Sequence, residues 1–188
     1  VSHTFYTQHT EEFYDFYKNK MIFLDAKPNK AHLKLAEMEQ AGKLSAIVTQ
    51  NIDGLHQAAG SKNVFELHGS VHRNYCQKCG KFFDVNYVVN AKGVPYCDEC
   101  GGIIKPDVVL YEEGLDSQTI NGAVRAISKA DMLIIGGTSL VVYPAAGMID
   151  YFKGKYLAVL NRDATSRDKQ ADLCITDPIG EVLGRIRV

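Results

Sequence analysis

Four cysteines form two C-x2-C pairs with 17 residues between the pairs, a spacing typical of thiolate ligands to a structural zinc ion. The four residues are Cys76, Cys79, Cys97 and Cys100. Gly80 and Gly101 follow the pairs, where a tight turn needs the left-handed backbone that glycine adopts easily. Four thiolates complete a tetrahedron and leave no position for water or substrate. The sequence therefore predicts a zinc ion that maintains structure and takes no part in catalysis.

Two other uses of these thiols are a redox pair and two disulfides. A thioredoxin-type pair opens a helix after a strand and occurs once, whereas two matched pairs occur here. Zinc sites of this kind contribute about 10–16 kcal/mol of apparent binding energy, so we expect the segment around the cysteines to unfold without metal. His72 stands near the first pair, but four cysteines already fill the coordination shell. Cys174 lies in an apolar run and is expected to be a buried core thiol.

Polar residues also gather where three apolar runs end. The runs continue as Thr49-Gln-Asn-Ile-Asp-Gly-Leu-His56, as Glu66-Leu-His-Gly69 and as Gly136-Gly-Thr-Ser139. In open α/β sheets, functional groups gather beyond the carboxyl ends of the strands, and small residues with N–H groups and hydroxyls suit a phosphate. Each segment alone has a plainer interpretation as a turn or a structural histidine. Their joint occurrence favours a functional site.

The apolar runs predict the elements that position these groups. Nearly continuous apolar runs, typical of strands buried on both faces of a parallel sheet, occur at residues 44–49, 64–67, 108–111, 132–135, 156–160 and 173–175. Helical spacing predicts helices near residues 10–24, 28–42 and 118–129. We predict an α/β protein whose doubly wound parallel sheet is formed by residues 1–72 and 106–188, with helices of a smaller domain near residues 4–40. Residues 73–105 break the rhythm and are predicted to be a zinc-ribbon insert.

The composition of the 188 residues is that of an ordinary globular domain, 46% hydrophobic and 23% charged. A net charge of −1 disfavours a surface built to neutralise nucleic-acid phosphates. No run of 18 apolar residues offers a membrane span, and no secretory signal is found. Paired cysteines that bind a metal suit a reducing compartment, so we expect a cytoplasmic protein with no nucleic-acid and no membrane partner.

The order of these segments resembles the sirtuins, the NAD-dependent protein lysine deacylases, and most closely their bacterial members. The resemblance rests on residues 49–56 and 65–69, both cysteine pairs, Lys105-Pro-Asp-Val-Val109 and Gly137-Thr-Ser139, and it extends from about residue 2 to the C-terminus. It implies a Rossmann-like large domain and a small zinc-ribbon domain, with NAD and an acyl-lysine peptide meeting in the cleft between them. The implied reaction removes acetyl or other acyl groups from protein lysines and gives nicotinamide and O-acyl-ADP-ribose.

The resemblance also implies which residues form the site. His68 and Asn51 would be catalytic, His68 as the general base toward a ribose hydroxyl and Asn51 beside the nicotinamide. The residues implied to bind NAD are Gln50, Asn51, Ile52, Asp53, Gly137, Thr138, Ser139, Asn161, Arg162, Asp163 and Asp177. Those implied to pair with the main chain of an acylated protein or peptide are Val108, Val109, Leu110 and Tyr111. NAD and structural zinc are the implied cofactors.

Two features depart from the family pattern. Sirtuins commonly have Phe-Gly-Glu after the substrate strand, whereas this chain has Tyr111-Glu112-Glu113, and we expect Glu112 to restrict the backbone and alter peptide preference. The Gly-Ala-Gly-x-Ser and Pro-Asp-Phe-Arg segments, which cover the NAD pyrophosphate in the family, are absent, and the chain starts at Val1 with no initiator Met. We expect either a fragment of a longer chain or a truncated descendant.

Three alternatives stay open beside the deacylase. A catalytically silent acyl-lysine-binding or scaffold module would explain the absent glycine loop, but it would not need Asn51, Asp53 and His68. A zinc-ribbon nucleic-acid binder is disfavoured by the charge of the chain. Mono-ADP-ribosyl transfer is a side activity that the resemblance permits.

Overall fold

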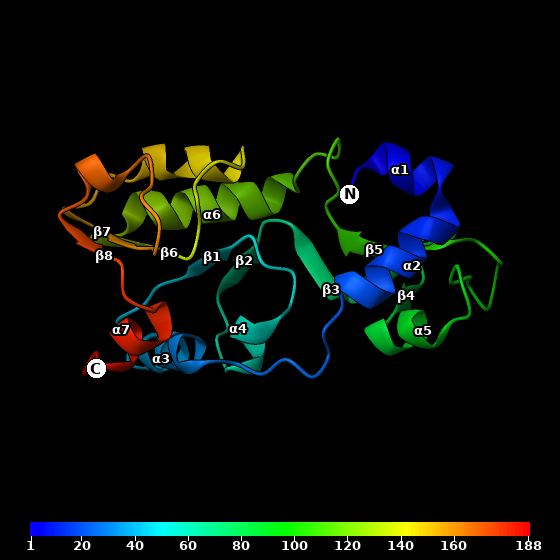
Figure 1. Ribbon diagram of the computed structural model, residues 1–188, viewed down its shortest axis with the longest axis horizontal. Helices are drawn as coiled ribbons and strands as arrows, with labels where there is room; N and C mark the ends of the chain where they lie inside the picture. Colours follow the sequence, from blue (N-terminus) through cyan, green and yellow to red (C-terminus); the bar gives the residue numbers. More distant parts are fainter. The chain divides into compact units, whose positions relative to one another are not determined.

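A computed structural model describes residues 1–188 and divides the chain into two compact units, whose elements are labelled in Figure 1. The first unit consists of Val1–Ala26, Gln50–Gly54 and His68–Leu115. The second consists of Lys27–Thr49, Leu55–Leu67 and Asp116–Val188. None of the helices has both the length and the apolar character that a membrane crossing requires.

The first unit is built on a three-stranded antiparallel sheet in the order β4-β3-β5. Its strands are β3 (Gly69–Cys76), β4 (Phe82–Phe83) and β5 (Ile104–Val108). Its helices are α1 (His3–Gln8), α2 (Thr10–Lys20) and α5 (Val85–Asn90). The sheet thus brings the first cysteine pair, at the end of β3, beside the segment that leads from the second pair into β5.

Helix α2 supplies the aromatic core of this unit. Acidic residues in its first turn and lysines in its last turn complement the helix dipole. Phe13, Tyr14 and Tyr17 recur at helical spacing and are fully buried. The Tyr14 hydroxyl donates a hydrogen bond to the carbonyl of Ile104 in β5. The helix is therefore anchored to the sheet by both apolar contact and a buried polar contact.

The second unit contains the parallel strands that the sequence predicts, in two groups. Strands β1 (Ile47–Thr49) and β2 (Val64–Glu66) form one parallel pair. Strands β6 (Met132–Gly136), β7 (Tyr156–Leu160) and β8 (Leu173–Ile175) form a parallel sheet in that order. Its α-helices are α3 (Lys30–Gln40), α4 (Leu55–Ala58), α6 (Ser117–Lys129) and α7 (Ile179–Gly184). Two 3-10 helices, η1 (Ala145–Tyr151) and η2 (Asp168–Gln170), complete the unit.

Local sequence signals explain where the helices of the second unit begin and pack. Asn29 forms a capping box with His32 at the start of α3, and the Asp116 side chain caps α6 through the N–H of Thr119. Helix α3 packs against α7, and α6 packs against β2. A Cβ at Gly122 would lie 2.3 Å from the Phe65 ring, so only glycine permits this close approach of α6 to β2.

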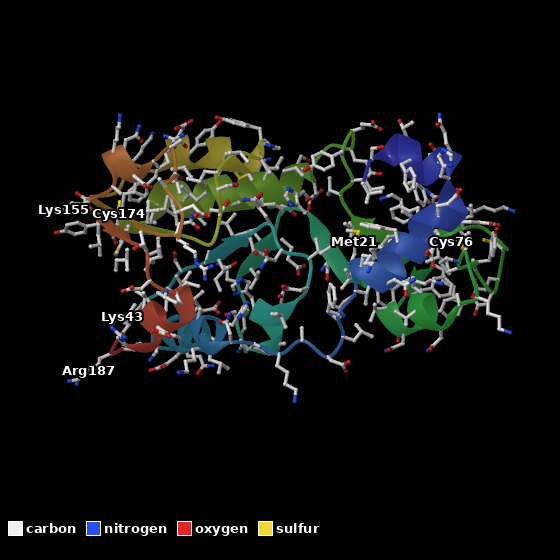
Figure 2. All side chains as sticks on the ribbon, in the orientation of Figure 1. Met21, Lys43, Cys76, Lys155, Cys174 and Arg187 are labelled. Carbon is white, nitrogen blue, oxygen red and sulfur yellow. The ribbon has the colours of Figure 1, made fainter.

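The expectation that all these strands are buried on both faces is wrong for the two edge strands of the β6-β7-β8 sheet. In β7 the four residues from Leu157 to Leu160 are buried, whereas β6 and β8 keep exposed positions. Cys174 in β8 is an exposed thiol, not the predicted core thiol, and Figure 2 labels it. An edge strand has a neighbour on one side only, so its side chains keep contact with solvent.

The strand predicted at residues 108–111 begins and ends earlier in the structure. Strand β5 covers Ile104–Val108, and its burial alternates along the strand. Such alternation is typical of a half-buried antiparallel strand, which a search for continuous apolar runs overlooks. The compact unit that holds the cysteines is also wider than the predicted insert of residues 73–105, since it includes Val1–Ala26, Gln50–Gly54 and all of β3.

Candidate functional site

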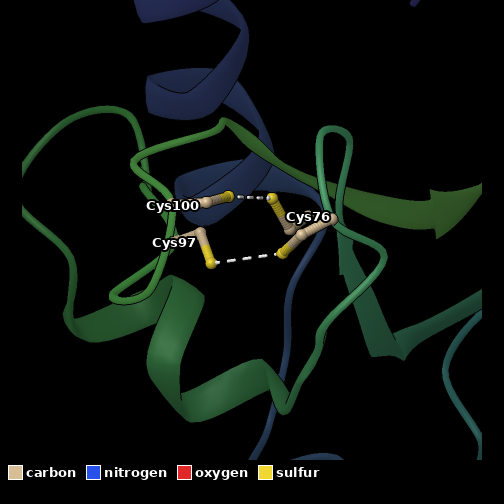
Figure 3. Close-up of side chains that lie close together, drawn as sticks. Cys76, Cys97 and Cys100 are labelled. Atoms are coloured by element: carbon tan, nitrogen blue, oxygen red, sulfur yellow. Dashed lines mark hydrogen bonds between the residues drawn. The ribbon is translucent and has the colours of Figure 1, made fainter.

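The four paired cysteines converge in the first unit. All four sulfur atoms lie within 4.8 Å of one another. The Sγ atoms of Cys76 and Cys100 are 3.4 Å apart, and those of Cys79 and Cys97 are 3.7 Å apart (Figure 3). A tetrahedral zinc ion with Zn–S bonds of about 2.3 Å separates its sulfur ligands by about 3.8 Å. The cluster therefore fits zinc, as the spacing of the cysteines predicts.

Two matching turns hold the thiols in place. The N–H of Gly80 donates to the carbonyl of Cys76 over 2.9 Å, and the N–H of Gly101 donates to the carbonyl of Cys97 over 3.0 Å. Both glycines have positive φ, 76° and 67°, as the sequence predicts. A Cβ at Gly102 would lie 2.8 Å from the Cys76 sulfur, so the chain approaches the cluster more closely than any other residue would allow.

The electrostatics of the thiols also favour a cation among them. Burial acts to raise the pKa of the Cys76 thiol, but hydrogen bonds from the N–H groups of Cys79 and Lys78 and from neighbouring thiols lower it to about 6. The N–H of Lys81 acts to lower the pKa of Cys79, but the adjacent thiols of Cys100 and Cys76 raise it to about 12. One thiolate thus opposes ionisation of the next unless a metal ion neutralises them.

Around the cluster, one ion-pair group joins the two turns. The Lys81 ammonium lies 2.8 Å from a carboxylate oxygen of Asp98 and 2.8 Å from one of Glu99. Hydrogen bonds to these two carboxylates raise the pKa of Lys81. The contact joins Lys81, two residues after the first cysteine pair, to the two residues within the second pair, so it supports the cluster without entering it.

The polar loop Gln50–Gly54 also belongs to the first unit, beside β3. The Nδ1 atom of His68 lies 3.0 Å from the carbonyl oxygen of Gln50. The N–H of Val71 donates to the carbonyl of Ile52 over 3.0 Å. The structure thus brings together four of the predicted site residues of this loop, Gln50, Asn51, Ile52 and Asp53, with the predicted base.

The contact with Gln50 determines which ring nitrogen of His68 carries the proton. A carbonyl oxygen can only accept a hydrogen bond, so Nδ1 must be the donor. In the neutral imidazole the other nitrogen, Nε2, then holds a lone pair and can accept a proton. The ring of His68 is therefore oriented by this bond, with Nε2 left to accept a proton.

The predicted substrate segment follows β5 and lies next to His68 in the same unit. The N–H of Val109 donates to the backbone carbonyl of His68 over 3.0 Å, and the N–H of Tyr111 donates to the carbonyl of Val1 over 3.1 Å. The N–H of Leu110 donates to the Glu113 carboxylate over 2.9 Å. These three N–H groups are used within the chain, and so are the carbonyls of Leu110 and Tyr111, which accept from the N–H groups of Glu113 and His3.

Glu112 occupies a backbone conformation that glycine favours. Its φ is 78°, the left-handed region that residues with a Cβ rarely adopt. Its carboxylate accepts hydrogen bonds from the hydroxyl of Thr4 over 2.7 Å and from the N–H of Thr4 over 2.8 Å, and these bonds lower the pKa of Glu112. The contact with α1 offsets the backbone strain, which explains how glutamate stands at a position where the family commonly has glycine.

Glu113 joins three segments of the first unit. Its carboxylate lies 2.8 Å from Nδ1 of His3 and 3.1 Å from the ammonium of Lys105. Burial acts to raise its pKa, but the hydrogen bonds from Leu110, His3 and Lys105 bring the pKa below its ordinary value. Glu113 is thus held as a carboxylate that fixes the end of the substrate segment.

The remaining predicted NAD-binding residues lie in the second unit, at one edge of the β6-β7-β8 sheet. Gly136, Leu160 and Ile175 are neighbours in the parallel register, so the residues that follow them emerge at the same edge. These residues are Gly137, Thr138 and Ser139 after β6, Asn161, Arg162 and Asp163 after β7, and Asp177 after β8. The structure therefore brings all seven to the carboxyl edge of one sheet, where nucleotides bind in α/β proteins.

The chemistry of this edge fits a dinucleotide. Gly137 has a φ of 63°, and the Thr138 hydroxyl accepts the N–H of Leu140 over 3.2 Å, which gives a tight turn with small side chains. The Asn161 side chain donates to the carbonyl of Asp163 over 2.8 Å. Hydroxyls and N–H groups suit phosphates, and carboxylates suit ribose hydroxyls.

A separate hollow of ~400 Å³ opens at the opposite, amino ends of β7 and β8. Its lining includes Lys155, Leu157 and Asp172. An ion pair between Arg167 and Asp150, with 2.6 Å between nitrogen and oxygen, occupies part of its wall. None of the predicted site residues lines this hollow, so it is not the predicted cofactor site.

Three residues with contacts at the site were not predicted from the sequence. His72 contacts the loop that contains Asn51, Lys105 contacts Glu113 and the carbonyl of Val108, and Glu112 contacts α1. The contacts of His72 and Glu112 join residues 19 and 108 apart in the sequence, whereas those of Lys105 span three and eight residues. Glu112 gave a signal because it departs from the family pattern, and Lys105 because it begins the motif Lys105-Pro-Asp-Val-Val109.

Comparison with known proteins identifies the family. The profile of the Sir2 family matches residues 1–144. An NAD-dependent protein deacetylase of Clostridium acetobutylicum is 66% identical over 184 residues, which cover 97% of this chain and 75% of that protein. An NAD-dependent protein deacetylase of Clostridium perfringens is 63% identical over 187 residues, which cover 99% of this chain and 77% of that protein. The chain thus spans about three quarters of the length of these relatives.

Solved structures of Sir2 proteins also match this chain. A Sir2 protein with a p53 peptide and NAD+ matches with a TM-score of 0.91 and 40% identity, covering 98% of this chain and 79% of that one. A Sir2 bound to an acetylated peptide matches with a TM-score of 0.90 and 40% identity, covering 98% of this chain and 80% of that one. These similarities confirm the predicted fold class and the resemblance to bacterial sirtuins. The chain belongs to the Sir2 family.

Proposed function

We propose that this chain catalyses the NAD-dependent deacetylation of lysine side chains in proteins and peptides, giving nicotinamide and O-acyl-ADP-ribose. The observation that carries the proposal is the contact of His68 Nδ1 with the Gln50 carbonyl, 3.0 Å away. It prepares a base on the same unit as the loop with Asn51 and Asp53 and next to the segment that starts at Val108. The deacetylase names of relatives above 60% identity support the same activity.

His68 performs the proton transfer. When bound, NAD supplies the electrophilic ribose carbon that takes the acyl oxygen as nicotinamide leaves. Nε2 of His68 accepts the proton of a ribose hydroxyl, and Nδ1 keeps its hydrogen bond to Gln50 throughout. That bond becomes charge-assisted once the ring is protonated, so the Gln50 carbonyl stabilises the imidazolium. A positioned base of this kind contributes about 10²–10⁴ in rate.

The two units divide the binding tasks. Asn51 and Asp53 contact the nicotinamide end, while the carboxyl edge of the β6-β7-β8 sheet, with Ser139 and Asn161, holds the phosphates and the adenosine ribose. The acylated peptide pairs with the main chain of residues 108–111. Glu112, whose carboxylate is held by Thr4, fixes the end of that segment and affects which peptides bind.

Zinc supplies no chemistry in this account. Cys76, Cys79, Cys97 and Cys100 would hold it as four thiolates, which leaves no open coordination position. Its role is to fix the end of β3 against the start of β5, where Cys76 pairs with Ile104; the substrate segment lies at the other end of this strand pair, where Gly69 pairs with Val108. Thiols that bind zinc must stay reduced, so we place the protein in the cytoplasm.

The test is to incubate the zinc-loaded chain with NAD and an acetyl-lysine peptide and to identify the products by mass spectrometry. His68→Ala is compared with His9→Ala, which replaces an exposed histidine between α1 and α2. The same reactions are run with the chain joined to the quarter of the Clostridium acetobutylicum relative that it does not match. We expect deacetylated peptide and O-acetyl-ADP-ribose with both the parent chain and His9→Ala, and a loss with His68→Ala.

Product that does not depend on His68 would contradict the assigned base. Peptide binding without any product, in both forms of the chain, would contradict the enzyme and favour the scaffold alternative.

A further inference from the structure

The loop Gln50–Gly54 is tied to one short stretch of chain by three hydrogen bonds in register. The carbonyl of Gln50 accepts from the His68 ring, that of Ile52 accepts from the N–H of Val71, and that of Asp53 lies 3.0 Å from Nε2 of His72. The loop belongs to the first unit, whereas the residues before and after it belong to the second. Bonds of this kind therefore determine where the loop lies within the first unit.

The His72 ring fits closely against the loop. A Cβ at Gly54 would lie 2.8 Å from Cδ2 of His72, and the φ of Gly54 is +69°. Both the space and the backbone conformation at residue 54 thus require glycine when the ring is present. The acceptor is a carbonyl oxygen, so Nε2 of His72 is the protonated nitrogen, opposite to the tautomer of His68.

We propose that His72 is a positioning residue that holds the Asp53 end of the loop, and with it Asn51 and Asp53, in the arrangement that binds the nicotinamide end of NAD. The inference rests on the proposed function for its kinetic consequence. His68 and His72 both donate to this loop, but His68 changes its protonation during the reaction. His72 has no part in proton transfer, and it donates from Nε2 whether its ring is neutral or protonated.

The experiment compares His72→Leu, which removes the donor, with His72→Gln, whose amide N–H can reach the same carbonyl. His9→Leu is the matched control, because His9 is an exposed histidine of the same unit. The Michaelis constants for NAD and for acetyl-lysine peptide and the value of kcat are measured separately on zinc-loaded protein, and zinc content is checked for each variant.

We expect His72→Leu to lower kcat/KM for NAD by at least about tenfold, since misplacement of a loop by about 1 Å can cost a hundredfold. We expect the KM for the peptide to stay within about twofold and His72→Gln to recover most of the loss. General damage to the fold would instead impair the kinetics with NAD and with the peptide alike. Unchanged kinetics for NAD in His72→Leu, or equal losses in His72→Leu and His72→Gln, would overturn the proposal.

A second measurement does not depend on activity. Nitrogen-15 NMR of the ring nitrogens should show protonated Nε2 for His72 and protonated Nδ1 for His68, and His72→Leu should shift the amide signals of Asn51 and Asp53 more than His9→Leu does. An Nδ1-protonated His72, or loop signals that do not move, would overturn the inference. If the parent chain makes no product while these signals behave as expected, the proposed function fails and the positioning role of His72 stands.

Discussion

The two compact units are stabilised in different ways. The first has a small antiparallel sheet, an aromatic core from α2 and a group of four thiols at one end. The second has parallel strands with aliphatic cores, such as the one around Ile135, Leu157 and Val159. The second unit is stabilised by burial of apolar surface. The first also brings four ionisable thiols together, and a bound cation is needed to offset the repulsion between their thiolates.

The units also differ in the kind of functional group they present. The first holds His68, the loop with Asn51, and the substrate segment, each fixed by hydrogen bonds between segments distant in sequence. The second holds the other seven predicted NAD-binding residues, which follow three adjacent strands. The groups that we propose to react are thus held by specific contacts, and those that we propose to bind phosphate and ribose come from the regular edge of a sheet. Each prediction below affects one unit and spares the other.

Removal of zinc should have the largest effect. Extraction of the metal with a chelator should abolish activity and unfold the region around Cys76 and Cys97, because apparent zinc binding energies are about 10–16 kcal/mol. Hydrogen exchange measured by mass spectrometry should show lost protection in residues 68–115 and retained protection in β6 and β7.

Cys174→Ser is the control for this experiment. This exposed cysteine lies in the second unit, and its replacement should leave zinc content and activity unchanged. Equal loss of protection in both units after metal removal would contradict the separation of their stabilities.

Gly69→Ala should be the most destabilising substitution by backbone contact. An added Cβ would lie 1.8 Å from the carbonyl oxygen of Asp107, and φ at this position is +75°. Overpacking together with left-handed strain should cost about 3–5 kcal/mol in the free energy of unfolding. Chemical denaturation with a probe in the first unit measures the loss.

Gly93→Ala separates the two causes. Its φ is +67°, but no atom lies within 4 Å of the added Cβ, so only the backbone strain of about 1–2 kcal/mol remains. If both substitutions cost the same, the close contact between β3 and β5 at Asp107 would not contribute as described.

Asp116→Ala should have the smallest effect and should act on the second unit. Asp116 caps α6 through the N–H and hydroxyl of Thr119, so its loss should lower Tm by about 2–4 °C. The hydrogen bond from the Thr119 N–H, the largest cause, and that from its hydroxyl lower the pKa of Asp116. The charged cap therefore stabilises fully above the ordinary aspartate pKa of about 3.9, and this contribution is lost as pH falls through the lowered value of the folded state.

Asp116→Asn tests the pH dependence. Asparagine keeps the cap oxygen without a charge, so the difference in Tm between the parent and Asp116→Asn should shrink as pH falls below about 4. A difference that does not change with pH would contradict the role of the carboxylate. Zinc content should stay the same in both variants.

The sequence predicted those parts of the fold and site that depend on local pattern. The cysteine spacing predicted the metal cluster, and five consecutive apolar residues predicted β7 with correct bounds. The prediction that Cys174 is buried was wrong, because whether a strand lies at the edge of a sheet depends on strand order, which a run of apolar residues does not encode. The predicted bounds of β5 were wrong because the strand alternates buried and partly exposed residues, and a search for continuous apolar runs overlooks such a strand.

Contacts between distant segments could not be predicted. The bond of His72 to Asp53 joins residues 19 apart, and the bond of Glu112 to Thr4 joins residues 108 apart. Each depends on which segments the fold places side by side. Family motifs predicted His68 and the strand-edge residues, but they contain no information on His72, because its partner is a backbone carbonyl that any residue could supply.

The most direct test of the division between the units compares His68→Ala in the first with Asn161→Ala in the second. Steady-state kinetics with NAD and an acetyl-lysine peptide are measured for both, on zinc-loaded protein. We predict that His68→Ala lowers kcat by about 10²–10⁴ with little change in the binding of NAD, and that Asn161→Ala raises the KM for NAD by about tenfold with kcat nearly unchanged. The same pattern of loss in both variants, or full activity without His68, would contradict the account.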